Sequence, residues 1–99
     1  MYRVAICDDE PMICSEIEEF INEYSRVSQT DIDTDVFFSG RELTNTISEQ
    51  GEEFDLILLD IEMSNGNGIF VGDYLRNIHK DDQTQIAIVS GKDGYDRQL

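Results

Sequence analysis

The chain has few basic residues and no long apolar run. Its 99 residues include only 7 Lys and Arg against 22 Asp and Glu, which gives a net charge of −15. A surface of this sign repels phosphate backbones, so these residues are not expected to contact nucleic acid. Because no run of about eighteen apolar residues occurs, a membrane-spanning helix is not expected either.

Cysteine is equally scarce. Cys7 and Cys14 are the only two, and their number and spacing suit neither a disulfide framework nor a zinc site. We expect two reduced thiols packed as small hydrophobic side chains, which favours a cytoplasmic location. The segment from Met1 to Asp8 becomes acidic too early for a signal peptide and is predicted to be a strand.

What is present is an alternation of apolar and amphipathic segments, which is typical of successive βα units. Strands are predicted at 2–7, 32–38, 54–59 and 85–89, and helices are predicted to begin near residues 11, 40 and 69. The nearly continuous apolar run at 54–59 indicates a strand buried on both faces, as in a parallel sheet between two layers of helices. The fold class is therefore α/β, a doubly wound parallel sheet.

The helices carry their own sequence markers. Pro11 suits a first helical turn, and an acidic residue just before it is expected to cap the free amides. Ser39 and Glu42 form a capping box for the second helix. The residues predicted to face inward are Ile13, Ile17, Phe20, Ile21 and Tyr24 in the first helix, Leu43 and Ile47 in the second, and Val71, Leu75 and Ile78 in the third.

No fifth apolar strand follows residue 89. A fourth strand left bare on one side is an aggregation hazard. We therefore expect residues 1–99 to be one domain truncated at its C-terminal side, within a longer protein, or a second copy to cover the open edge.

Polar side chains follow three of the predicted strands. Asp8 and Asp9 close the first, Asp60 the third and Ser90 the fourth. Right-handed crossovers place all these strand ends at one edge of the sheet, where ligands bind in such folds. Three carboxylates that meet there need either a proton or a cation to relieve their repulsion, and Mg²⁺ is the natural cation.

Each element of this site also has an ordinary structural interpretation. The Asp pair before Pro11 could cap a helix, Asp60 could be a turn residue, and Ser90 could be a turn hydroxyl. Their joint placement at one edge of one sheet favours a functional site.

With these residues placed, the sequence resembles the receiver domains of bacterial response regulators. The motifs that carry the resemblance are Asp8-Asp9-Glu10-Pro11, Asp60-Ile61-Glu62-Met63 followed by Gly68, and Ser90, thirty positions beyond Asp60. The segment 37–40 and the wording around Asp60 look most like receivers of LytTR-type transcriptional regulators.

The resemblance implies a phosphorylated aspartate at Asp60. It also implies Mg²⁺ bound by Asp8, Asp9, Asp60 and the backbone carbonyl of Glu62, and a phosphoryl-sensing hydroxyl at Ser90. The family's fold has strand order 2-1-3-4-5, and the lysine that closes its fifth strand has no counterpart here. The implied partners are a sensor histidine kinase and a missing C-terminal output domain that binds DNA, with a homodimer left open. Such a domain is a signalling module that transfers a phosphoryl group onto itself and is not a turnover enzyme.

Three other functions share parts of this pattern. A flavodoxin-like cofactor binder would need Ser, Thr and Gly after the first strand, where this chain has Asp8-Asp9-Glu10. A Mg²⁺-dependent phosphohydrolase would carry Asp-x-Asp in that loop. A degenerate receiver that acts only as a protein-interaction module is the closest rival, although the acidic residues are intact.

Overall fold

The computed structural model describes residues 1–60, 71, 73–78 and 83–89. Its elements follow the predicted order. They are the strand β1 (Tyr2–Cys7), the helix α1 (Pro11–Ser28), the strand β2 (Ile32–Phe37), the helix α2 (Gly40–Gln50), the strand β3 (Leu56–Leu59), the short π-helical segment η1 (Tyr74–Ile78) and the strand β4 (Gln85–Ile88). The last three strands are one or two residues shorter than predicted.

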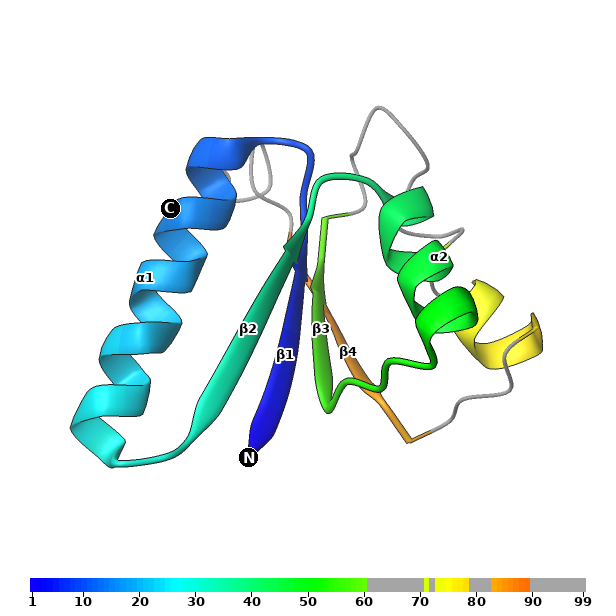
Figure 1. The fold of residues 1–99 in the computed structure, drawn as a ribbon. Coiled ribbons are helices and arrows are strands. Elements are labelled where there is room, and N and C mark those ends of the chain that lie inside the picture. The colour runs from blue at the N-terminus through cyan, green and yellow to red at the C-terminus, as the bar shows by residue number, and fades with distance from the viewer. Residues whose placement is uncertain (61–70, 72, 79–82, 90–99) are drawn as a thin grey trace.

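The four strands form one parallel sheet in the order β2-β1-β3-β4. β1 therefore pairs with β2 on one side and with β3 on the other, as Figure 1 shows. The predicted parallel topology is confirmed. All four strands run in one direction, so the carboxyl ends of β1 and β3 lie side by side at one edge of the sheet.

Helices cover both faces of the sheet (Figure 1). One face packs against α1 through a cluster that contains Val4, Ile6 and Cys14. The other packs against α2 and the segment around η1 through a larger cluster. β3 contributes to both, because Ile57 and Leu59 are buried in the larger cluster while Leu56 and Leu58 pack against the α1 side. This confirms the prediction of a strand covered on both faces.

The predicted inward face of α1 was partly wrong. Phe20 and Tyr24 have exposed fractions of 75% and 57%, while Cys14 is buried and Ile17 and Ile21 pack beside it. A helix on a sheet buries one stripe along its length, and here the stripe is centred on Cys14 and Ile21. Phe20 and Tyr24 lie to one side of that stripe. The larger side chains therefore did not decide how α1 is rotated against the sheet.

The two helix starts differ from each other. The capping box of α2 is confirmed, since the Ser39 hydroxyl accepts the Glu42 amide at 3.1 Å and the Glu42 carboxylate accepts the Phe38 amide at 3.2 Å. The expected acidic cap of α1 is wrong, because Glu10 at its N-cap position makes no capping hydrogen bond with its side chain. The Asp8 carboxylate instead accepts the amide of Glu10, so it serves the loop and not the helix.

The third helix is partly described. Val71 and Leu75 are buried in the larger cluster, as predicted. The predicted start near residue 69 and the side chain of Ile78 lie outside the part of the structure that is described.

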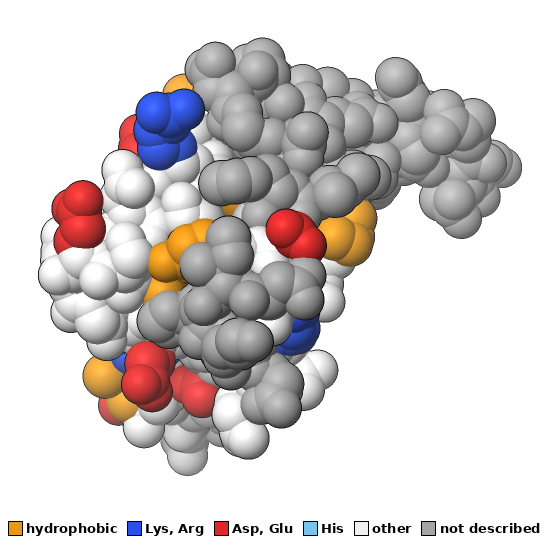
Figure 2. All heavy atoms as spheres, turned by 90° about the vertical axis from the view of Figure 1, so that its right-hand side faces the viewer, with side chains coloured by type: hydrophobic (Ala, Val, Ile, Leu, Met, Phe, Trp, Pro, Cys, Tyr) orange, Lys and Arg blue, Asp and Glu red, His pale blue; other side chains and the backbone are white. Residues whose placement is uncertain are grey.

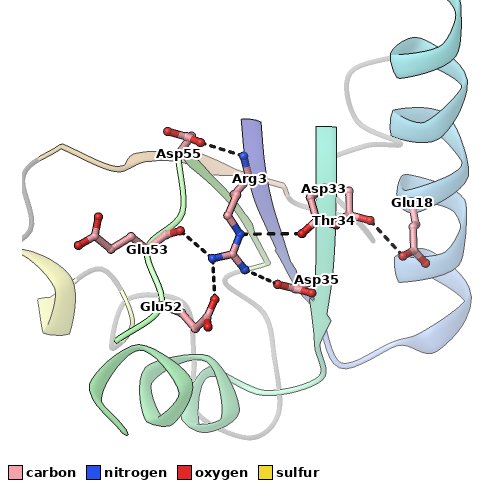
Figure 3. A network of polar contacts seen from close by, with 8 residues as sticks. All are labelled: Arg3, Glu18, Asp33, Thr34, Asp35, Glu52, Glu53 and Asp55. Carbon is pink, nitrogen blue, oxygen red and sulfur yellow. Dashed lines mark hydrogen bonds and ion pairs between the residues drawn. The ribbon is translucent and has the colours of Figure 1, made fainter. Parts of the chain in front are cut away.

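A network around Arg3 ties the amino-terminal part of the sheet together (Figure 3). The guanidinium pairs with Asp35 at 2.8 Å and Glu52 at 2.5 Å, lies 3.9 Å from Asp33, and stacks 4.7 Å from the centre of the Phe54 ring. It thereby links β1, β2 and the segment that follows α2. One arginine holds carboxylates that would otherwise repel one another in this strongly acidic chain.

The face that carries α2 shows how the surface charge is distributed. Figure 2 shows acidic side chains scattered over it, and the described Lys and Arg side chains do not gather into a basic patch there.

Candidate metal centre

Three carboxylates meet at the edge where β1 and β3 end. One oxygen each from Asp8, Asp9 and Asp60 lie within 4.8 Å of one another. Asp8 and Asp60 each have an exposed fraction of 2%, and Asp9 is half-buried. The structure thus brings together the three acidic side chains that the sequence predicted would converge.

The backbone of the sheet places these residues. The Asp8 amide donates to the Phe37 carbonyl at 3.0 Å, and the Asp60 amide donates to the Cys7 carbonyl at 3.0 Å. Both bonds continue the parallel ladders by one residue beyond β1 and β3. Asp8 and Asp60 therefore occupy adjacent strand ends as rigid extensions of the sheet, which is the kind of support that a precise binding site requires.

The loop after β1 fixes the side chain of Asp8. Its Oδ1 accepts the Glu10 amide at 3.0 Å, which closes a short turn around Asp9. This turn leaves the Asp8 carboxylate at the same edge of the sheet as Asp60.

The cluster is electrostatically unfavourable on its own. Burial raises the pKa of Asp8 above its ordinary value of 3.8, the Glu10 amide opposes that rise, and the negative charges of Asp60 and Asp9 add to it. Each of these raising effects is a cost of the ionised form. A bound cation would remove the like-charge part of that cost.

The donor set suits a hard divalent cation. All three side chains offer oxygen, which Mg²⁺ prefers, and Oδ1 of Asp9 and Oδ2 of Asp60 are shielded from solvent. Among the described residues the cluster holds carboxylates alone, without the imidazole or thiolate donors that favour zinc or copper. The residues present therefore fit Mg²⁺, as predicted. The other two predicted site residues, Glu62 and Ser90, lie outside the described residues.

Two buried thiols lie beside this centre. Burial raises the pKa of Cys7 to about 12 and that of Cys14 to about 11. Both cysteines are free and buried, in agreement with the prediction of reduced, packed thiols. Sequence reasoning missed one contact: the Cys14 Sγ donates a hydrogen bond to the backbone carbonyl of Asp8 at 3.3 Å. No spacing rule pairs positions 8 and 14, so nothing in the sequence could have indicated it.

Comparison with known proteins agrees with this fold. The family model described as the response regulator receiver domain matches residues 4–98. The fold and the acidic centre define a signalling receiver. The chain belongs to the response regulator receiver family, whose members are signalling modules in two-component systems.

Two solved structures illustrate the likeness. The response regulator TrrA from Thermotoga maritima, in complex with Mg²⁺ and a beryllium fluoride, superposes with a TM-score of 0.76 at 26% identity, over 100% of this chain and 77% of that one. The response regulator domain of CheB from the same organism gives a TM-score of 0.67 at 25% identity, over 96% and 68% of the two chains. The comparison with curated proteins gives no match.

The flavodoxin-like doubly wound fold is confirmed by these superpositions and by the strand order. Within the described residues, none of the helices combines the length and the apolar character of a membrane span.

Proposed function

We propose that this receiver accepts a phosphoryl group on Asp60 in a reaction that depends on Mg²⁺. The observation that carries the proposal is the meeting of the Asp8, Asp9 and Asp60 carboxylates within 4.8 Å at the end of adjacent strands. The neighbouring structure of TrrA holds Mg²⁺ and a beryllium fluoride, and its likeness to this chain supports the same ligand class here.

The residues would share the work as follows. A carboxylate oxygen of Asp60 attacks phosphorus while the bond from phosphorus to the donor's leaving group breaks. Asp8 and Asp9, with Asp60 and the backbone carbonyl of Glu62, would hold Mg²⁺, which supplies positive charge against the phosphoryl oxygens. Burial of Asp8 and Asp60 keeps this electrostatic interaction in a poorly screened environment. Ser90 would hydrogen-bond the transferred group and shift the loop after β4.

The wider context extends the same proposal. The phosphodonor would be a sensor histidine kinase, and the domain would act on a C-terminal DNA-binding output domain of LytTR type, outside residues 1–99. Two reduced thiols support a cytoplasmic location. A homodimer is compatible with the exposed β4, whose Ile88 is 55% exposed.

A degenerate receiver that only binds partners is the second candidate, because the family match alone does not require phosphorylation. The intact acidic centre favours the phosphoacceptor, since three buried or half-buried like charges have no benefit for a module that never binds a cation.

Acetyl phosphate and Mg²⁺ provide the test. The wild-type chain should gain one phosphoryl mass in intact-mass spectrometry, and Asp60→Asn should not. Asp31→Asn is the matched control, because Asp31 is an exposed aspartate before β2 and should leave the modification unchanged. A wild-type chain that folds and binds Mg²⁺ but stays unmodified would support the interaction module. A chain that binds no Mg²⁺ would contradict the proposed centre.

A further inference from the structure

The loop that carries Asp8 and Asp9 is attached to α1 at two points, and both involve Cys14. The Cys14 amide donates to the Glu10 carbonyl at 3.1 Å, and its Sγ donates to the Asp8 carbonyl at 3.3 Å. Asp9 lies between these two anchored residues. Cys14, in the first turns of α1, thus holds the carbonyls on both sides of Asp9: its side chain contacts that of Asp8, and its backbone amide contacts that of Glu10.

Cys14 is itself immobilised. It has an exposed fraction of 2% and packs in the cluster with Val4 and Ile6 of β1. A thiol is a donor at neutral pH, because its ordinary pKa lies above 8. The Asp8 carbonyl points to that donor while the Asp8 amide is held by Phe37 of β2. The peptide groups on both sides of Asp8 are therefore fixed by different elements.

We infer that Cys14 is a positioning residue for the metal centre, holding the Asp8-Asp9 loop in its cation-binding arrangement through the thiol-to-carbonyl hydrogen bond. The inference rests on the proposed binding of Mg²⁺ and adds a residue that does not itself touch the ion. Groups around metal ligands that fix their orientation are a general requirement for affinity. Here the fixed group is the carbonyl of the peptide bond that joins Asp8 to Asp9, so the hydrogen bond from Cys14 orients the backbone that carries both carboxylates.

Serine and alanine at position 14 separate the hydrogen bond from the packing. The two side chains have nearly the same size, but only the serine hydroxyl can donate to the Asp8 carbonyl. Cys14→Ser should keep the Mg²⁺ dissociation constant within about twofold of wild type, whereas Cys14→Ala should weaken it about fivefold, the effect of one modest buried hydrogen bond. Ser15→Ala, on the exposed neighbouring position of α1, is the control and should change nothing.

Nuclear magnetic resonance of the ¹³C,¹⁵N-labelled chain provides two readouts from one sample. Mg²⁺ titration gives the dissociation constant, and the ¹³C chemical shift of the Asp8 carbonyl without metal reports the hydrogen bond directly. Cys14→Ala should move that carbonyl resonance, and Cys14→Ser should keep it close to wild type. Each variant is measured below its unfolding transition.

The outcomes separate cleanly. Equal Mg²⁺ affinities for the Ser and Ala variants would overturn the inference, because the side chain would then matter only for packing, even if both variants were less stable. An Asp8 carbonyl resonance that does not respond to Cys14→Ala would also overturn it. Absence of Mg²⁺ binding by the wild type, with the carbonyl resonance still responding, would instead refute the proposed function and the role of Cys14 toward the ion, while leaving the hydrogen bond in place.

Discussion

Replacing the buried carboxylate of Asp60 by a neutral amide should make the metal-free protein more stable, even though Asp60 is the proposed site of phosphorylation. Two unit charges 4.8 Å apart repel by about 3.5 kcal/mol at an effective dielectric constant of about 20. Asp60→Asn keeps the shape of the side chain and removes its repulsion with Asp8 and Asp9. Because the three carboxylates lie at the solvent edge of the sheet, where Asp9 is only half-buried and part of the repulsion is screened, we expect a gain of about 2–3 kcal/mol in the free energy of unfolding.

Urea denaturation at neutral pH in the presence of a chelator measures this gain. The effect should persist at physiological ionic strength, because the separation of 4.8 Å is shorter than the screening length of about 8 Å. Adding Mg²⁺ at about a hundred times its dissociation constant should stabilise the wild type by about 2.7 kcal/mol and the variant by less. Asp31→Asn, an exposed aspartate, should leave the stability unchanged within about 0.5 kcal/mol.

The pH dependence gives an independent check with a definite sign. The folded-state pKa of Asp8 is raised above 3.8, so its contribution to stability is present below that pH and is lost as the pH rises through the folded pKa. Asp60→Asn should flatten this decline in the chelated protein. If the variant is less stable than wild type without metal, the three carboxylates do not repel one another as the structure indicates.

The Arg3 network, the cap of α2 and the two buried thiols should each respond measurably to perturbation. Arg3→Met should lower the free energy of unfolding by about 1–2 kcal/mol. Each partly exposed ion pair contributes little, and the contact between the guanidinium and the Phe54 ring contributes about as much as the ion pairs. In a urea titration, high salt should reduce the difference between the variant and the wild type. Ser39→Ala should cost about 1 kcal/mol through the lost cap of α2, measured by thermal unfolding, and an unchanged midpoint would mean that the cap is dispensable. Burial raises the folded pKa values of Cys7 and Cys14 to about 12 and 11, so the stability that the two thiols contribute is present below pH 9 and is lost as the pH rises through those values. Both thiols should resist alkylation in the native protein and react only at the rate of unfolding. Rapid labelling of the native protein would contradict their burial.

Local patterns were enough to predict the order of strands and helices and the parallel sheet. Apolar runs, the Ser39 capping box and the Asp8 and Asp60 strand ends are all encoded within a few residues of sequence. Right-handed crossovers place the carboxyl ends of all the strands at one edge of the sheet, and the strand order that the family resemblance implies puts β1 beside β3. The convergence of the three carboxylates was therefore predictable before any coordinates, whereas Glu62 and Ser90 remain predictions from the family resemblance.

Only the tertiary structure decided the contacts that depend on how an element is rotated against its neighbours. Helical periodicity placed Phe20 and Tyr24 with the buried residues of α1, but the helix docks on the stripe around Cys14 and leaves both exposed. The same rotation brings the Cys14 thiol to the Asp8 carbonyl. Arg3, likewise, gathers carboxylates from segments 30 to 50 positions away, and its partners could not be read from its own surroundings in the chain. The spacing of apolar residues shows which side chains share one face of a helix, and the packing of the whole helix against the sheet decides which of its faces is buried.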